Sequence, residues 1–190
     1  YAGALAGPLR GAAVLNYVSS HDDGSPYDPE RRDPFGAGTR LLLAPGGAQI
    51  YYGDELARPL RVPGAEGDAN LRSVMDWASA KPGSAGADVL RHWRKLGGFR
   101  REHPAVGAGV HRSLREEPYI FSRTLEVDGR TDRVLVAMGQ GTEARRIPVF
   151  GLFPEGTELV DAYSGVSGRV AGDTVALEGG ADLVLLAPRH

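Results

Sequence analysis

Two polar clusters in the N-terminal half of the chain contain the side chains best suited to chemistry. The first, at residues 20–23, places an imidazole beside two carboxylates directly after the apolar run 14–18. The second, at residues 54–55, follows the shorter run 49–52. An imidazole beside a carboxylate can bind the hydroxyls of a polyol, stabilise a positively charged transition state or ligate a metal ion. In folds that alternate strands and helices, such side chains gather where a strand ends.

Each cluster also has a purely structural interpretation. An Asp that follows a strand often only caps the loop, so a functional role and a capping role both stay open for His21 and Asp22. For Asp54 and Glu55 we favour a helix N-cap and a structural ion pair. Residue types alone therefore place the first cluster ahead of the second as a candidate site.

The elements that would position both clusters alternate between strand and helix. The apolar runs 14–18 and 49–52 are predicted to be strands, and residues 35–44 and 87–102 have the spacing of amphipathic helices. This alternation predicts a parallel sheet with crossover helices. Because both strands are mostly apolar, they have the pattern of strands covered on both faces.

The pattern changes near His103-Pro104, where a helix would have to end. Residues 106–190 lose the helical period and contain short strand-like runs separated by turn signals such as Asp128-Gly129 and Gly179-Gly180. The strand-like runs lie at residues 119–121, 134–137, 158–160 and 183–186. We therefore expect an α/β domain at 1–105, followed at 106–190 by an all-β sandwich or small barrel.

Bulk composition excludes several classes of protein. Of the 190 residues, 42% are hydrophobic and 24% are charged, which is typical of a globular protein. A net charge of −2 with scattered basic residues favours neither a nucleic-acid partner nor a polybasic membrane anchor. No apolar run approaches the roughly 18 residues of a membrane span. The absence of cysteine excludes disulfides and cysteine-bound metals.

Four segments, in the right order, resemble the α-amylase family of glycoside hydrolases. NYVSSHDD resembles the family's seventh barrel strand, which ends in Asn-His-Asp, and LLLAPGGAQIYYGDEL resembles its eighth-strand segment. RSVMDW is similar to its Arg-x-x-Met-x-Trp loop, and LRHWRKLGGFRREHPAVGAG to its last barrel helix with the entry to domain C. The resemblance implies strands 7–8 of a (β/α)₈ barrel with their helices, followed by an antiparallel β-sandwich domain C.

The resemblance also implies roles for individual residues. Asp22 aligns with the family's third acid, which stabilises the oxocarbenium-like transition state without forming the covalent bond, and His21 aligns with the histidine that hydrogen-bonds the same sugar ring. Further residues are expected at the periphery of the site: Asp23, Tyr52, Glu55 and Arg72. Ser20, where the family usually has Asn, and residues 47–49, in place of Gly-Ile-Pro-x, depart from the pattern and put the subfamily in doubt.

The two other catalytic carboxyl groups of the family are missing from this chain. A retaining glycosidase needs a nucleophile and an acid/base about 5–5.5 Å apart, and the family carries them on its fourth and fifth strands. An Arg-x-Asp triplet at residues 31–33 lies in a Pro-rich loop with no strand before it, and Glu116-Glu117 lies in the β-domain. We therefore expect a fragment of a retaining α-glucan hydrolase, acting on α-1,4 bonds of an α-glucan or maltooligosaccharide. It would need the missing N-terminal part of the barrel and be inactive alone.

Other interpretations stay open. A transglycosylase of the same family would share these segments. A non-catalytic carbohydrate-binding or scaffolding piece would show exposed aromatic rings on the β-domain, where we expect most aromatics to be core. No metal or cofactor is assigned, although the full-length parent could bind Ca²⁺ through acidic loop residues. An extracellular location is favoured slightly over a cytoplasmic one.

Overall fold

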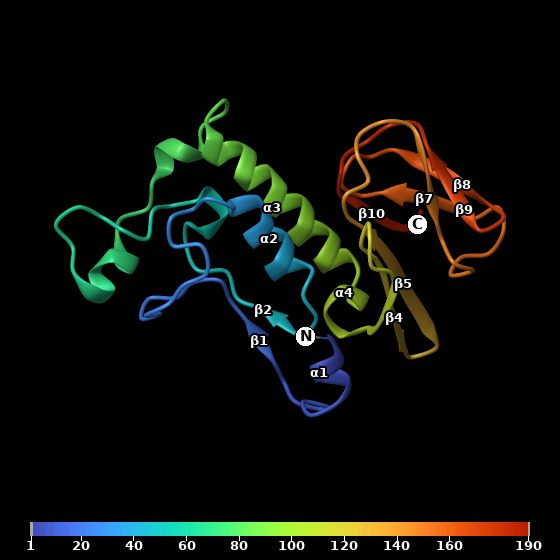
Figure 1. Cartoon of the computed structure of the whole chain (residues 1–190), viewed down its shortest axis with the longest axis horizontal. Helices are drawn as coiled ribbons and strands as arrows, with labels where there is room; N and C mark the ends of the chain where they lie inside the picture. The colour runs from blue at the N-terminus through green and yellow to red at the C-terminus, as the bar shows by residue number, and fades with distance from the viewer. Residues whose placement is uncertain (1, 190) are drawn as a thin grey trace. The chain divides into compact units, whose positions relative to one another are not determined.

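The computed structural model describes residues 2–189. Contacts divide the chain into two compact units, Tyr1–Gly98 and Phe99–His190, called the N-terminal and C-terminal units below. The long helix α3 (Ala85–Glu102) passes from one unit into the other (Figure 1). The boundary predicted from the sequence, after residue 105, lies beyond the end of that helix and stays a prediction.

A parallel pair of short strands forms the sheet of the N-terminal unit. After helix α1 (Ala2–Ala6), strand β1 (Leu15–Asn16) pairs with β2 (Gly47–Ala48), and helix α2 (Pro34–Leu42) lies between them in sequence. The prediction of a second strand at residues 49–52 is therefore wrong in position, because the strand lies just before these residues. The ladder ends with the Gln49 amide donating to the Asn16 carbonyl at 2.8 Å. The strand–helix–strand order confirms the α/β prediction.

Local capping explains why α2 begins where it does. Asp33 is its N-cap and accepts from the Gly36 amide at 2.9 Å, and Pro34 occupies the first turn, where its missing N–H costs nothing. The indole of Trp93 on α3 donates to the Pro34 carbonyl at 3.0 Å. A side chain at Gly38 would lie 2.6 Å from that indole, so α2 and α3 pack closely only because Gly stands there.

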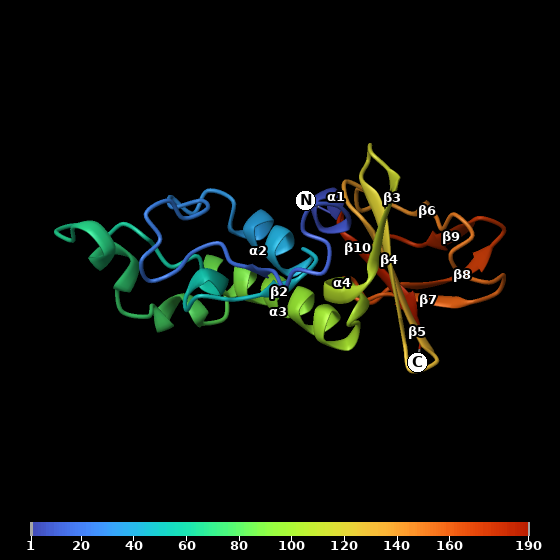
Figure 2. The same ribbon diagram turned by 90° about the horizontal axis from the view of Figure 1, so that it is seen from below.

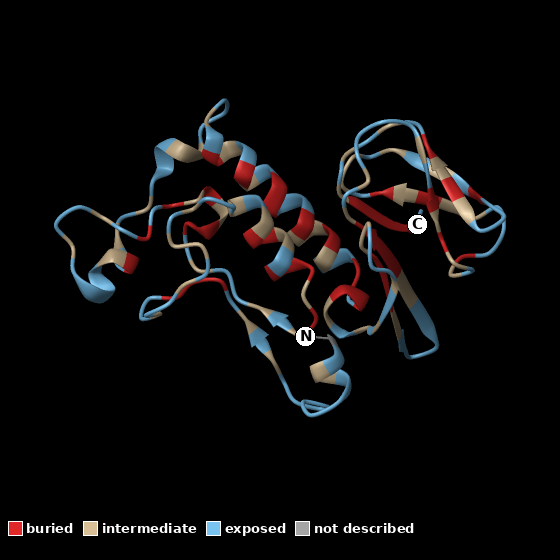
Figure 3. Ribbon diagram, in the orientation of Figure 1, coloured by how far each residue is buried: buried red, intermediate tan, exposed pale blue. Residues whose placement is uncertain are grey.

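Helix α3 continues through Gly97-Gly98, although each Gly disfavours a helix by about 1 kcal/mol relative to Ala. Leu96 and Phe99, on either side of the pair, are fully buried. Buried positions, drawn red, recur along the long helix in Figure 3. Burial of this apolar stripe outweighs the propensity of the two glycines. Three 3₁₀ turns precede α3 in the long loop: η1 (Asp54–Leu56), η2 (Gly67–Arg72) and η3 (Trp77–Ala80).

The outward side chains of the parallel pair remain exposed within the described residues. Leu15 is 59% exposed, Tyr17 51% and Ile50 48%. Two parallel strands cannot cover their own faces, so the expectation of strands covered on both faces is not met by these residues.

The C-terminal unit is an eight-stranded antiparallel sheet, entered through the short helix α4 (Ala105–Ala108). The strand order is β3-β4-β5-β10-β7-β8-β9-β6, and β4 and β5 form its longest pair (Figure 2). The strands are β3 (Val110–Arg115), β4 (Ile120–Val127), β5 (Arg130–Ala137), β6 (Arg145–Pro148), β7 (Glu158–Asp161), β8 (Ser167–Ala171), β9 (Thr174–Leu177) and β10 (Val184–Pro188). The predicted all-β architecture is confirmed.

One apolar core lies inside this sheet. Leu135 on β5, Ile147 on β6 and Leu186 on β10 are all fully buried in the same cluster. Because β5 and β6 stand far apart in the strand order, the sheet must curl over itself to bring them together. The core thus packs like that of a β-sandwich, although all of its strands belong to one continuous hydrogen-bonded sheet.

Two carboxylates, the partly buried Asp132 and the fully buried Asp161, hold segments of the C-terminal unit together. Asp132 accepts from His103 Nδ1 at 2.9 Å and from the Ala105 amide at 2.8 Å, which ties the start of α4 to β5. Asp161 accepts from the Leu185 amide at 2.8 Å and from the turn that follows β7. These contacts replace the solvation that each carboxylate loses to the extent that it is buried.

His111 on β3 makes the stability of the C-terminal unit depend on pH. Arg123 Nε donates to its Nδ1 at 3.4 Å, which fixes that nitrogen as an acceptor, and Tyr119 lies 3.3 Å from its Nε2. Burial, and then the charge of Arg123, lower the pKa of His111 below its ordinary value of 6.5. The unfolded chain therefore binds a proton that the folded chain resists, and stability is lost as pH falls below about 6.5.

We predict that His111→Asn loses less stability than the wild type between pH 7.5 and 5.5, since Asn offers an acceptor near Nδ1 but does not titrate. Urea denaturation followed by circular dichroism at both pH values measures the difference. Equal losses in the two proteins would contradict the assignment.

Candidate active site

The segment that follows β1 turns from buried to exposed within four residues. Ser19 and Ser20 are buried, whereas the side chains of His21 and Asp22 are 65% and 61% exposed. The Ser20 hydroxyl donates to Asp22 Oδ1 at 2.9 Å, and His21 Nε2 lies 3.6 Å from Asp22 Oδ2. The imidazole and the carboxylate therefore lie together on a surface where a hydroxyl-rich ligand can reach both.

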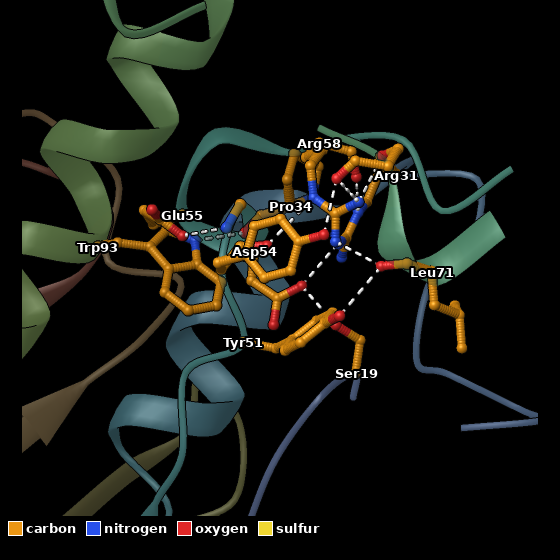
Figure 4. A network of polar contacts seen from close by, with 12 residues as sticks. Ser19, Arg31, Pro34, Tyr51, Asp54, Glu55, Arg58, Leu71 and Trp93 are labelled. Atoms are coloured by element: carbon orange, nitrogen blue, oxygen red, sulfur yellow. Dashed lines mark hydrogen bonds and ion pairs between the residues drawn. The ribbon is translucent and has the colours of Figure 1, made fainter. Parts of the chain in front are cut away.

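A buried ion pair lies directly behind this segment. Asp54 Oδ1 accepts from the Ser19 hydroxyl at 2.7 Å and from Arg31 Nη2 at 2.6 Å, with the Asp54 side chain fully buried (Figure 4). The expected structural ion pair is therefore present, but the expected helix cap is not, because the N-cap position of η1 is Gly53. Glu55 accepts from the Gly53 amide at 2.9 Å, so its carboxylate is engaged with the backbone.

Arg58 organises the loop on the other side of Asp54, and sequence reasoning missed it. It is buried, and its guanidinium carbon lies 4.2 Å above the Tyr52 ring. Its Nη2 donates to the Leu71 carbonyl at 2.9 Å and its Nη1 to the Ser73 hydroxyl at 2.5 Å. The one sequence signal is an Arg within the apolar stretch Leu-Ala-Arg-Pro-Leu, which is weak because long side chains often pass through such stretches to water.

The residues expected at the periphery of the site lie near it. Arg72 Nε donates to the His21 carbonyl at 3.0 Å, which ties the loop after η2 to the exposed pair. Tyr52 donates from its hydroxyl to the Ser73 carbonyl at 2.7 Å, and Asp23 accepts from the Ser25 amide at 2.9 Å. The structure thus gives each of these side chains a role in shaping the loops.

The carboxylates in the loop at residues 28–33 accept hydrogen bonds from backbone amides. Asp28 accepts from the amides of Arg32 and Asp33 at 2.8 and 2.7 Å, and Asp33 caps α2. Among residues 2–189, no group of three His, Cys, Asp or Glu side chains could hold a metal ion. Over the same residues, no helix combines the length and the hydropathy that crossing a bilayer requires.

Comparison with known proteins finds a related α-amylase. The chain is 40% identical over 133 residues to the periplasmic alpha-amylase of Escherichia coli K12, a match that covers 70% of this chain and 18% of that protein. The chain is related to the α-amylases. No family model matches it. The resemblance predicted from the four sequence segments is confirmed.

Several solved structures, two of them of α-amylases, share the fold. A Geobacillus thermoleovorans alpha-amylase, solved in complex with acarbose, matches with a TM-score of 0.61 at 20% identity, over 93% of this chain and 39% of that one. An Anoxybacillus alpha-amylase matches with a TM-score of 0.59 at 21% identity, over 93% of this chain and 38% of that one. AmyP, solved in complex with maltose, matches with a TM-score of 0.61 at 16% identity, over 93% of this chain and 41% of that one. The α-amylase-like chain thus spans about two fifths of these relatives and less than a fifth of the E. coli protein.

We predict that Arg58→Met lowers the free energy of unfolding of the N-terminal unit by at least about 3 kcal/mol, because several hydrogen bonds to a charged group are lost together. Arg58→Lys should restore only a minor part, since an ammonium group cannot reproduce the planar fork. Urea unfolding followed by the fluorescence of buried Trp93 measures both.

Arg91→Met is the matched control, because Arg91 is exposed on α3. It should change the same free energy by less than about 0.5 kcal/mol. A similar effect of the two Met variants would show that Arg58 contributes no more than a surface arginine.

Proposed function

We propose that this chain is part of a retaining α-glucan hydrolase acting on α-1,4 bonds, in which Asp22 stabilises the transition state and His21 hydrogen-bonds the same sugar ring. The observation that carries the proposal is the exposed Asp22–His21 pair at the end of β1, in a chain 40% identical to an α-amylase. Glycoside cleavage passes through an oxocarbenium-like state, and a fixed anion favours that state over the ground state.

The geometry around Asp22 also supports the proposal that the chain alone is inactive. A retaining mechanism needs two further carboxyl groups facing each other at about 5–5.5 Å. Asp54 is buried and engaged by Arg31 and Ser19, and Glu55 is engaged by the Gly53 amide. These carboxylates are therefore occupied, and we assign the nucleophile and the acid/base to the N-terminal part of a barrel outside this chain.

The substrate class follows from the same comparison. Since AmyP and the Geobacillus enzyme were solved with maltose and acarbose, we infer an α-glucan or maltooligosaccharide as substrate. The periplasmic location of the E. coli relative favours action outside the cytoplasm. We assign no cofactor; Ca²⁺ in the full-length parent stays a proposal. A transglycosylase would use the same residues, and product analysis on a maltooligosaccharide discriminates it because a transferase also makes longer chains.

A non-catalytic carbohydrate-binding piece is the alternative from another class. Such a module stacks sugar faces on exposed aromatic rings. In the C-terminal unit, Phe121 and Phe153 are buried, and Tyr119, Phe150 and Tyr163 are partly buried. The burial of these rings supports the hydrolase over this alternative.

We predict that the 190-residue chain, incubated at high concentration with a chromogenic maltooligosaccharide or with soluble starch, releases no product, whereas the full-length parent does. Product release is measured by the absorbance of the chromogenic group and, for starch, by an assay of reducing ends. Clear hydrolysis by the isolated chain would show that it carries its own nucleophile.

We predict that Asp22→Asn in the full-length parent lowers kcat at least about 10²-fold, the scale on which loss of one transition-state electrostatic contact acts. Circular dichroism should show an unchanged fold, because Asp22 is exposed. Asp88→Asn is the matched control and should have little effect, since Asp88 forms an exposed ion pair on α3 outside the site. Full activity of Asp22→Asn would refute the assigned role.

A further inference from the structure

The buried carboxylate of Asp54 connects the ends of both parallel strands. It lies in η1, which closely follows β2, and it accepts from Ser19, which lies after β1 and 35 positions away in sequence. Ser19 is three positions before Asp22, and the neighbouring Ser20 hydroxyl contacts Asp22 Oδ1 directly. A short, buried path of hydrogen bonds and backbone thus leads from Asp54 to the exposed acid.

We propose that Asp54 is a positioning residue for Asp22, which it holds in place through Ser19 and with the help of Arg31. The inference rests on the proposed function, since it assigns Asp54 to the same reaction. Asp54 is fully buried behind the segment and does not reach substrate itself. Its effect on catalysis would come through the placement of Asp22, and a misplacement of about 1 Å can cost roughly 10²-fold in rate.

The charge of Asp54 is needed to hold Arg31. The Arg31 side chain is 7% exposed, and its Nε donates to the Arg58 carbonyl at 2.8 Å. The Arg31 backbone has φ of 53°, a left-handed conformation that residues other than Gly adopt at a cost. Loss of the Asp54 charge would leave the Arg31 guanidinium buried and unpaired, which is strongly destabilising.

The two contacts of Asp54 share one oxygen. Ser19 and Arg31 both donate to Oδ1, and Oδ2 is buried with no hydrogen-bond partner among residues 2–189. Asn at position 54 can therefore keep its carbonyl oxygen toward both donors and place its amide where Oδ2 lies. Asp54→Asn removes the charge with little change of shape, whereas Ser19→Ala removes one hydrogen bond and leaves the ion pair intact.

The first test measures kcat and KM of the full-length parent per folded molecule, for Ser19→Ala and Asp54→Asn. We expect kcat to fall at least about tenfold in Ser19→Ala, which breaks the link to Asp54, and by a smaller factor in Asp54→Asn, whose carbonyl oxygen still accepts from Ser19. KM should change less than about threefold in both, since a displaced transition-state contact affects kcat. Asp88→Asn, in an exposed ion pair on α3, is the matched control and should leave both constants unchanged. Loss of thermal stability with unchanged kcat per folded molecule would overturn the inference.

The second test uses the 190-residue chain and does not depend on activity. In two-dimensional NMR spectra, Ser19→Ala should shift the amide signals of His21 and Asp22, and Asp88→Asn should not. Unchanged signals for both residues would overturn the positioning role even if Asp54→Asn fails to fold. If instead Asp22→Asn keeps full activity while these signals shift, the proposed function fails and the structural link from Asp54 to Asp22 stands.

Discussion

The arrangement of the N-terminal unit depends on the buried ion pair between Asp54 and Arg31. Arg31 lies in the loop between β1 and α2, and Asp54 begins the short 3₁₀ turn η1, so each has backbone hydrogen bonds only to nearby residues and neither belongs to a strand ladder. A buried carboxylate and guanidinium are costly to desolvate and stay buried only when their geometry satisfies both. Because Ser19 donates to the same carboxylate oxygen, the pair also fixes the end of β1. The segment that carries the exposed His21 and Asp22 is therefore held by this ion pair rather than by strand pairing.

Arg58 extends this arrangement without using a carboxylate partner. Its guanidinium binds carbonyl oxygens and a hydroxyl from the segment 71–73 while it stacks on Tyr52. The neighbouring Arg72 then binds the carbonyl of His21. Three arginines thus shape one group of loops by different contacts. Arg31 pairs with a buried carboxylate, Arg58 binds the backbone and an aromatic ring, and Arg72 binds the backbone at His21.

The sequence predicted those helices and strands that are determined by residue patterns within the element itself. Helix α2 was predicted because its apolar spacing lies within the element itself, and the antiparallel strands were predicted from short apolar runs between turn residues. Strand β2 was placed wrongly, because Gly47 and Ala48 have almost no side chain to form a pattern and their pairing is decided by β1. An ion pair was expected at Asp54, but its partners were not identified, and Arg58 was missed. The partners that connect them to other loops lie 13 to 35 positions away in sequence, and no spacing rule relates them.

Two features have a common explanation under the proposed function: the apolar residues beside β1 and β2 are exposed, and the carboxylates of Asp54 and Glu55 are engaged within the described residues. A parallel pair cannot bury its own faces, so Leu15, Tyr17 and Ile50 need a covering layer that the described residues do not supply. In a closed barrel, neighbouring strands cover such faces, and the ends of those strands also carry the catalytic side chains. The layer that would bury Leu15 and Ile50 is therefore also the layer that would bring a nucleophile toward Asp22. Because the Asp54 contacts already hold the end of β1 within this chain, the position of Asp22 does not depend on that layer, whereas the reaction does.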